Sequence, residues 1–361
     1  MKHTHRRDVI ARSTGFVARR GAQIPVLLAP MAGVNTVALS SSVINAGGVG
    51  GCGALLMTPE EILAWAHDVR QCGPGPFQIN LWVPSPEPTY SACLLEGQRT
   101  FLSEWGPVPA TVLQSAVSPF DEQFEALLTI RPAAISSIMG LFSERHVAKL
   151  KSQGIEWWAT VTSTDEALLA QRAGADAVIV QGSEAGGHRG AFSPEKAGAN
   201  LGGLIALVPR VCDLVDIPVI AAGGIADGRS IAAALVLGAS AVQIGTGFLR
   251  TPEAQVHPAY AREIAHTEAH GTCLTRVYSG RTGRAISNHF TAAASQDTAP
   301  EPLPYPLQRQ LTQAMRVDAE QHGDVERMQM WAGQAAALAR ALPAADLVAR
   351  MWQDSMTLIG N

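Results

Sequence analysis

Short apolar runs alternate with helix-like segments along most of the chain, and this alternation restricts the possible folds more than any other feature. Strands that alternate with helices form parallel sheets with right-handed crossovers. Eight such units predict an α/β fold, a closed (β/α)8 TIM barrel with a helix after every strand, rather than an open doubly wound sheet. The predicted strands are 24–29, 49–54, 77–81, 133–138, 155–161, 176–180, 217–222 and 241–245.

Capping residues and glycines mark the expected ends of the helices between these strands. Pro59-Glu-Glu places proline and acidic residues where a helix N-terminus favours them. Thr164 and Asp227 are the predicted N-caps of two later helices, and Gly154 ends another. The predicted helices are 36–45, the segment from 59, 119–130, 143–153, 164–174, 201–215 and 227–237.

The alternation is interrupted once and ends near residue 250. Prolines at 84, 86, 88, 107 and 109 flank a helix-like middle, which predicts an insertion at 82–118. The residues after 250 have a helical pattern and contain a proline-rich hinge at 299–306. We therefore expect an N-terminal arm at 1–22 and a barrel at 23–250 that forms the binding domain. The segment 251–361 should join the insertion in a smaller helical subdomain over the barrel mouth.

Charge and hydropathy exclude several classes of function. The net charge is −4 without a long basic run, so nothing indicates binding to nucleic acid or to an anionic membrane. The basic start, Lys2 to Arg20, lacks the apolar region of a secretory signal. The sequence also contains no run of about 18 apolar residues, the length needed to span a membrane. The 5 cysteines form no CxxC motif, which favours reduced thiols. We expect a cytoplasmic protein.

A glycine-rich decapeptide, Gln181-Gly-Ser-Glu-Ala-Gly-Gly-His-Arg-Gly190, follows the predicted strand at 176–180 without a break. Barrels of this class hold their active-site residues at the carboxyl ends of the strands. Gly186 and Gly187 lack a Cβ, so the backbone there can adopt positive φ or lie against a planar or phosphorylated ligand. We therefore predict that His188 is presented to an active site and is not merely a structural histidine in a turn.

Other strand ends share this polar or glycine-rich character, and a barrel brings them to one rim. The residues are Pro30, Met31, Ala32, Asn80, Gly223, Gly224, Gln243, Ile244, Gly245 and Thr246. The backbone amides of the glycines after the last two strands, together with the Thr246 hydroxyl, suit a phosphate group. The alternative is that these glycines only allow a tight turn between strand and helix. Together with the amide side chains of Asn80, Gln181 and Gln243, such a phosphate site favours a mononucleotide with a polar ring, and FMN fits best.

Three other patterns are weaker. The sequence at 48–53 matches GxGxxG, but it follows a helix and lies inside a strand, whereas the dinucleotide fingerprint needs the strand first. Ser183 lies in Gly-Ser-Glu and not in the GxSxG turn of serine hydrolases. Histidines 257, 266 and 270, with Glu268, favour a solvated helix face over a metal site.

These motifs together resemble the nitronate monooxygenase family, formerly called 2-nitropropane dioxygenase. The resemblance covers roughly residues 20–290, and the histidine loop is its most specific part. The segments that carry it are Ala-Pro-Met at 29–31, Asn-Ala-Gly-Gly-Val-Gly at 45–50, Asn80, the decapeptide 181–190, Ala-Ala-Gly-Gly-Ile at 221–225, Gln-Ile-Gly-Thr at 243–246 and Ser-Gly-Arg-Thr-Gly-Arg at 279–284.

The resemblance implies that FMN is bound by Asn80, Gln181, Gly186, Gly224 and residues 243–246, and that His188 is catalytic. The family oxidises alkyl nitronates with O2 to a carbonyl compound and nitrite, so the expected partners are a small nitronate and O2. An imidazole beside a flavin can orient or neutralise an anionic nitronate, or remove a proton next to a nitro group.

Two alternatives remain open. The FMN-dependent enoyl-acyl-carrier-protein reductases share the barrel and a Gly-Gly-His loop, but they use NAD(P)H and have glutamate at the position of Gln181. A flavin-binding barrel without catalytic activity is the other alternative. Residues 136–140 and Trp157-Trp158 depart from the family pattern, and both segments could face the substrate, which leaves the identity of the substrate open. Arg281 and Arg284 either reach the cofactor phosphate or form surface salt bridges.

Overall fold

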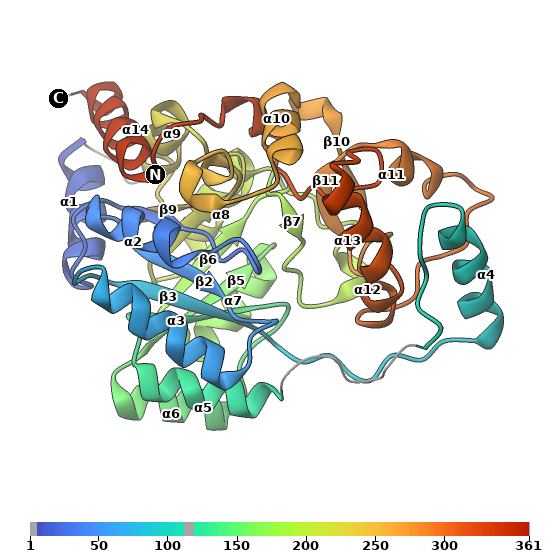
Figure 1. Ribbon diagram of the computed structural model, residues 1–361. Helices are drawn as coiled ribbons and strands as arrows, with labels where there is room; N and C mark the ends of the chain where they lie inside the picture. Colours follow the sequence, from blue (N-terminus) through green and yellow to red (C-terminus); the bar gives the residue numbers. More distant parts are fainter. Residues whose placement is uncertain (1–5, 112–118, 361) are drawn as a thin grey trace.

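The computed structural model describes residues 6–111 and 119–360; residues 1–5 of the predicted arm and 112–118 of the predicted insertion lie outside the described part. Eight parallel strands form one sheet in the order β1-β9-β8-β6-β5-β4-β3-β2, and a bridge between Leu27 and Val49 joins its two edges. The sheet therefore closes into the predicted TIM barrel (Figure 1). The strands are β1 (Val26–Leu28), β2 (Gly50–Gly53), β3 (Phe77–Trp82), β4 (Ala134–Ile138), β5 (Glu156–Val161), β6 (Ala177–Gln181), β8 (Val219–Ala222) and β9 (Ala241–Ile244).

A ring of helices covers the outside of the barrel, most of them at the predicted positions. Asp227 caps α9 as expected, whereas the N-cap of α7 is Ser163, one residue before the predicted Thr164. Ser163 is the cap because its hydroxyl accepts the Glu166 N–H. The helices that follow strands are α2 (Val37–Asn45), α3 (Pro59–Gln71), α5 (Phe120–Ile130), α6 (Glu144–Gln153), α7 (Thr164–Arg172), α8 (Leu204–Leu214) and α9 (Gly228–Val236).

The helix predicted directly after the eighth barrel strand is absent from that position. Strand β9 is followed only by the short 3-10 helix η2 (Thr246–Phe248), and the chain then leaves the barrel. It returns as α14 (Ala344–Ile359), which packs against α9 and α2 and buries Leu347, Val348 and Met351 there. The helix predicted after the eighth strand is thus supplied from about a hundred residues further along the chain (Figure 1).

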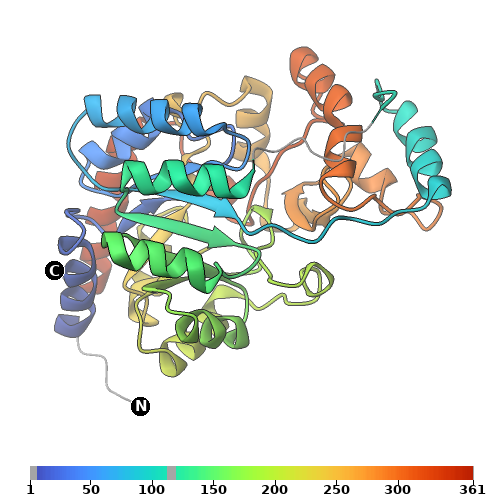
Figure 2. The ribbon, with the colours of Figure 1, turned by 90° about the horizontal axis from the view of Figure 1, so that it is seen from below.

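The predicted insertion and the C-terminal segment pack together beside the barrel (Figure 2). Leu102 of α4 lies in one apolar cluster with Tyr278, Phe290 and Leu303. The helices here are α4 (Ala92–Ser103), α10 (Pro258–His266), α11 (His289–Ala293), α12 (Leu307–Leu311) and α13 (Gln313–His322). This subdomain also contains an antiparallel sheet that the sequence did not predict, in which β11 (Gly283–Ile286) lies between β10 (Thr272–Thr275) and β7 (Gly187–His188).

The amino-terminal end of the barrel is closed by helix α1 (Arg6–Ala18). Phe16 of this helix packs against Trp158 inside the barrel, with ring centroids 6.0 Å apart. Arg20 forms an ion pair with Glu156 at 2.7 Å, and Glu156 also accepts the Trp158 indole N–H at 2.7 Å. No helix among residues 6–111 and 119–360 is long and apolar enough to cross a membrane.

Trp157 and Trp158, whose role the sequence left open, do not line the cavity at the strand tips. Trp158 is fully buried at the closed end of the barrel. Trp157 points outward, stacks on Phe142 with ring centroids 5.4 Å apart and donates its indole N–H to Ser137. Both residues lie at the start of β5, at the end of the barrel opposite the strand tips, and neighbouring side chains in a strand alternate between faces.

Candidate active site

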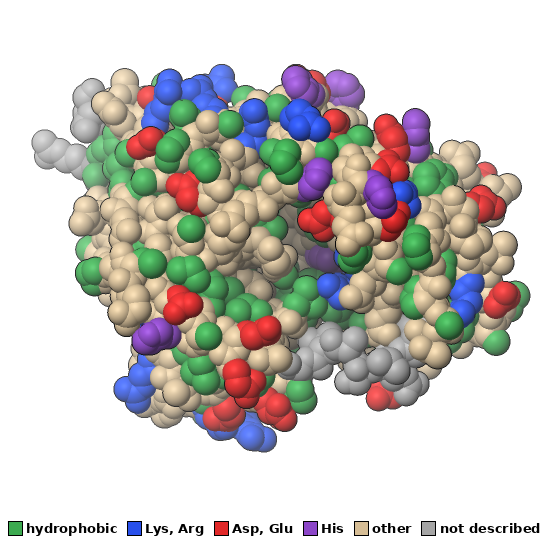
Figure 3. All heavy atoms as spheres, viewed as in Figure 1, with side chains coloured by type: hydrophobic (Ala, Val, Ile, Leu, Met, Phe, Trp, Pro, Cys, Tyr) green, Lys and Arg blue, Asp and Glu red, His purple; other side chains and the backbone are tan. Residues whose placement is uncertain are grey.

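A cavity of about 520 Å³ lies at the carboxyl ends of the barrel strands, beneath the subdomain. The surface is hollowed between these two parts, with histidine, basic and acidic side chains at the edge of the hollow (Figure 3). All but one of the predicted site residues line the cavity: Pro30, Met31, Ala32, Asn80, Gln181, Gly186, Gly187, His188, Gly223, Gly224, Gln243, Gly245 and Thr246.

Ile244 is the exception. Its side chain is completely buried in the apolar core between the barrel and the helices, because it follows the inward-pointing Gln243 in the strand. Its carbonyl oxygen accepts the Ala29 N–H at 2.9 Å. Ile244 therefore supports the wall of the cavity without lining it.

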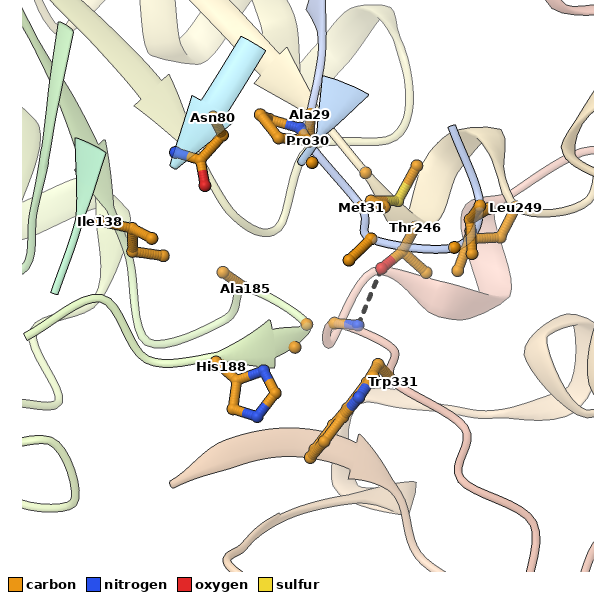
Figure 4. Close-up of a pocket in the computed structure, with 18 of the residues that line it drawn as sticks. Ala29, Pro30, Met31, Asn80, Ile138, Ala185, His188, Thr246, Leu249 and Trp331 are labelled. Atoms are coloured by element: carbon orange, nitrogen blue, oxygen red, sulfur yellow. Dashed lines mark hydrogen bonds between the residues drawn. The ribbon is translucent and has the colours of Figure 1, made fainter. Parts of the chain in front are cut away.

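Two amide side chains present opposite hydrogen-bonding groups to the cavity. Asn80 donates its Nδ2 to the Ser136 carbonyl and hydroxyl oxygens, at 3.2 and 3.1 Å, and its Oδ1 faces the cavity (Figure 4). Gln243 accepts the Gln78 Nε2 N–H at 2.7 Å through Oε1, which leaves its own amide N–H groups as donors. Gln78 was not predicted, since a buried glutamine within a strand carries no recognised motif.

Gln181 is oriented by the loop that follows it. Its Oε1 accepts N–H groups from Arg189 Nη1 at 3.1 Å and Gly190 N at 2.8 Å, while its Nε2 donates to the His188 carbonyl at 3.0 Å. Burial and the nearby Arg284 lower the pKa of Arg189 to about 10, so this buried cation stays charged at neutral pH. The loop thus holds the Gln181 amide in one orientation, with one Nε2 hydrogen still unused.

The glycines after the seventh barrel strand adopt backbone conformations that other residues rarely take. Gly223 has φ 112° and Gly224 has φ 66°. A Cβ on Gly224 would lie 3.2 Å from Cβ of Glu184, whose carboxylate accepts the Leu204 N–H at the start of α8. After the next strand, Thr246 Oγ1 accepts the Gly333 N–H at 3.0 Å, so its hydroxyl hydrogen is free to donate toward the cavity (Figure 4).

The two glycines before the histidine have different roles. A Cβ on Gly186 would lie 2.5 Å from Gly333 N and 2.6 Å from the Ala332 carbonyl carbon, so the backbone of the C-terminal segment, and not only a ligand, requires glycine there. Gly187 has φ 75°, and a Cβ there would meet open space. It is therefore the backbone conformation that favours glycine at 187.

His188 is held by the subdomain as much as by the barrel. Its strand β7 pairs with β11, where His188 lies opposite Gly283. Its ring contacts the indoles of Trp82 and Trp331, at centroid distances of 4.9 and 4.8 Å. Its Nε2 is 2.8 Å from the Ser279 hydroxyl. The sequence analysis placed His188 on a loop and did not identify these three neighbours.

The imidazole of His188 is neutral at physiological pH. Burial, followed by the positive charges of Arg281, Arg309 and Arg316, lowers the pKa of His188 to about 3. Burial lowers the pKa of Arg316 to about 10, and its guanidinium donates to Thr312, to Gln329 and to the Arg309 carbonyl oxygen. The histidine therefore faces a cationic wall without being charged itself.

The two motif arginines, Arg281 and Arg284, are both buried and neither forms a surface salt bridge. Arg281 donates to the Ser85 hydroxyl, from the start of the insertion. Arg284 donates to the Ser183 carbonyl at 2.9 Å and to the Thr272 hydroxyl at 2.9 Å. Arg284 thereby ties the histidine loop to the β10–β11 hairpin, and neither arginine lines the cavity.

Asn35 organises the first strand end and was not predicted. Its Oδ1 accepts the N–H groups of Met31 and Gly53, and its Nδ2 donates to the Ala29 carbonyl at 3.1 Å. A single side chain thus sets the course of the loop that lines the cavity after β1. Polar residues just after a strand are common, so the sequence offered little to distinguish Asn35.

The histidines considered as metal ligands are scattered. His257 lines the cavity and caps α10, since its Nδ1 accepts the Ala259 N–H at 3.2 Å. His266 ends α10, and His270 lies in the 3-10 helix η4 (Ala269–Gly271). In the part of the chain that the structure describes, no group of three or more His, Cys, Asp or Glu side chains is arranged to hold a metal ion.

Known proteins resemble this chain over nearly its full length. The family model described as nitronate monooxygenase matches residues 17–354. Nitronate monooxygenase from Pseudomonas aeruginosa is 40% identical over 340 residues, which cover 92% of this chain and 96% of that protein. Nitronate monooxygenase from Paraburkholderia phytofirmans is 38% identical over 92% of each chain.

Solved structures give a consistent result. Nitroalkane oxidase from Streptomyces ansochromogenes matches with a TM-score of 0.85 and 32% identity, covering 96% of this chain and 100% of that chain. FabK from Thermotoga maritima matches with a TM-score of 0.73 and 27% identity over 96% of each chain. The family match and the relatives both extend across the barrel, the histidine loop and the subdomain. The chain belongs to the nitronate monooxygenase family.

Proposed function

We propose that this enzyme binds FMN in the cavity and oxidises small alkyl nitronates with O2 to a carbonyl compound and nitrite, with His188 as the catalytic residue. The family is one of flavin-dependent monooxygenases, which supports a flavin here. The observation on which the proposal depends is a neutral imidazole at a cationic wall, next to a cavity whose other sides carry amide groups.

The donor set fits a flavin ring and its phosphate. The pyrimidine edge of a flavin carries carbonyl oxygens and one N–H, so it needs donors and an acceptor together. Gln181 and Gln243 supply amide donors and Asn80 an acceptor. On the proposed assignment the phosphate lies near Gly224 and Thr246. The cavity of about 520 Å³ is within the usual range for ligand pockets. When bound, the flavin supplies the electron transfer with O2.

The residues around His188 suit an anionic substrate. A nitronate carries a negative charge, which Arg281, Arg309 and Arg316 attract across a site of low polarity. The neutral imidazole can donate a hydrogen bond to a nitronate oxygen or accept a proton from a neutral nitroalkane. Trp82 and Trp331 contact the imidazole and replace part of its water shell with apolar surface.

An enoyl-acyl-carrier-protein reductase activity is the second candidate, because FabK has the same overall fold. The bond from Gln181 Nε2 to the His188 carbonyl argues against it. The glutamate expected in that family has no N–H with which to make this bond. Gln181 therefore orients the histidine loop through a hydrogen bond that glutamate at the same position could not donate.

An anaerobic titration of the purified holoenzyme tests the proposal. We expect a yellow protein whose flavin absorbance is bleached by propyl-2-nitronate and hardly changed by NADPH. Rapid reduction by NADPH without a response to the nitronate would support the reductase instead. A colourless protein that takes up no added FMN would contradict the cofactor assignment. The cytoplasmic location expected from composition is a further proposal, which fractionation of the source cells would test.

A further inference from the structure

The ring of His188 has one hydrogen-bonding partner among the described residues, the buried hydroxyl of Ser279. The bond joins Ser279 Oγ to Nε2 at 2.8 Å. The other ring nitrogen, Nδ1, lies on the edge of the ring turned toward Ala185 and the cavity (Figure 4). The nitrogen turned toward the cavity and the nitrogen bonded to Ser279 therefore belong to one neutral imidazole, which has a single N–H.

The surroundings of Ser279 allow its hydroxyl hydrogen two directions. Oγ lies 3.3 Å from the Arg281 N–H, which donates to it, and 3.3 Å from the Arg281 carbonyl oxygen, which can accept from it. The hydroxyl hydrogen can thus point to His188 Nε2 or to the Arg281 carbonyl. The first direction has the shorter separation, 2.8 against 3.3 Å.

The loop that holds Ser279 cannot readily move away from the ring. Gly280 has φ 86°, donates its N–H to the Arg276 carbonyl at 2.7 Å and packs so closely on the Leu303 carbonyl that a Cβ would overlap it. The backbone at Ser279 is therefore held in place, and the Arg281 N–H bonds its side-chain oxygen. What remains free is the rotation of its O–H bond.

We propose that Ser279 is a positioning residue that sets the tautomer of His188. When its O–H donates to Nε2, the ring proton is on Nδ1 and faces the cavity as a hydrogen-bond donor to an anionic nitronate oxygen. When the O–H turns to the Arg281 carbonyl, Nε2–H donates to Ser279 and Nδ1 presents a lone pair, which can accept the proton of a neutral nitroalkane. This inference rests on the proposed function for the identity of the substrate, but not for the state of the ring.

The charged groups around the ring keep it neutral. Arg281 lies in the β10–β11 connection, Arg309 on α12 and Arg316 on α13, and all three act on the imidazole. Tyr305 and Glu320 also line the cavity. With three cations nearby, the ring does not become an imidazolium, so the choice between the two neutral tautomers decides whether Nδ1 donates or accepts.

The test is 15N NMR of the oxidised holoenzyme labelled at histidine, with the His188 signals assigned from their loss in His188→Gln. We expect Nε2 to be unprotonated and hydrogen-bonded, and Nδ1 to be protonated. Ser279→Ala should retain FMN but lose this preference, so that both nitrogens move toward averaged shifts. Ser279→Thr, which keeps the hydroxyl, should restore it.

Ser355→Ala is the matched control, since Ser355 is also buried and bonds a backbone carbonyl, but on α14. Its His188 signals should be unchanged. In parallel, Ser279→Ala should lower kcat/KM for the nitronate by roughly 3- to 10-fold, the loss expected for one neutral hydrogen bond. Unaltered His188 shifts in Ser279→Ala, or a wild-type ring protonated at Nε2, would overturn the inference. A wild-type enzyme without nitronate activity would overturn the proposed function and leave the NMR result to decide on Ser279.

Discussion

The two ends of the barrel use the same strands for different purposes. At the amino-terminal end, Phe16 and Trp158 pack together, and Glu156 is paired with a cation and with the indole N–H. At the carboxyl end, Asn80 and Gln243 use only part of their hydrogen-bonding capacity within the protein. The closed end therefore contributes stability, while the open end keeps polar groups available for a ligand. Substitutions at the two ends should accordingly change different measurements.

The largest effect on stability is expected from Trp158→Ala at the closed end. Removing a fully buried indole leaves a large cavity and should lower the free energy of unfolding by roughly 3–5 kcal/mol. Urea denaturation measures this loss. The folded variant should keep the KM of the wild type, because Trp158 does not line the active-site cavity. A marked loss of FMN affinity without a loss of stability would contradict the comparison.

His188→Ala should produce the opposite pattern at the open end. We expect kcat to fall by roughly 10²- to 10³-fold if the imidazole acts on the substrate, while the flavin spectrum and the urea midpoint change little. Steady-state kinetics with propyl-2-nitronate measure the change. Kinetics equal to those of the wild type would remove His188 from the mechanism.

Gly224→Ala separates backbone strain from ligand contact. Gly224 has φ 66° and Gly154, the C-cap of α6, has φ 68°, so alanine at either position should cost about 1–2 kcal/mol of strain. Only Gly224 lines the cavity. We expect Gly224→Ala to weaken FMN binding by at least about tenfold and Gly154→Ala to leave it unchanged, as measured by fluorescence titration of the apoprotein. Equal affinities in the two variants would contradict a phosphate site at Gly224.

The last prediction concerns pH dependence. The pKa of His188 is lowered to about 3. The pH profile of kcat/KM should therefore show no inflection from His188 near pH 6.5. A lowered histidine pKa means that the unfolded chain binds the proton more tightly. Its contribution to stability is therefore complete above about pH 6.5 and decreases as the pH falls toward 3. This contribution is measured by comparing the urea midpoints of the wild type and His188→Gln across this pH range. If the two plots of urea midpoint against pH were parallel, the lowered pKa of His188 would be contradicted.

The barrel could be predicted because its strands are buried on both faces and appear as apolar runs, as in β6 and β8. The cavity-lining residues could be predicted because they follow these runs directly, as Gln181 and Gly223 do. Ile244 was included by adjacency, although side chains alternate along a strand. A two-residue strand such as β7 has no pattern of its own, so its pairing with β11 was not predictable.

Contacts between distant segments account for the other missed features. Ser279 is 91 residues from His188 in sequence, and only the fold brings the hydroxyl to the ring. The position of α14 in the helix ring depends on how the chain returns from the subdomain, which no local periodicity records. Gln78 and Asn35 act by hydrogen bonds to backbone and amide groups that the sequence does not identify.

The late position of α14 has a consequence for synthesis on the ribosome. All eight strands and the other ring helices emerge before residues 344–359, so the apolar faces of α9 and α2 have no cover until that segment leaves the exit tunnel. A nascent chain at that stage exposes the surface that Leu347, Val348 and Met351 later bury. Chaperones that bind apolar surfaces have their natural target there, and truncation before residue 344 would make this exposure permanent.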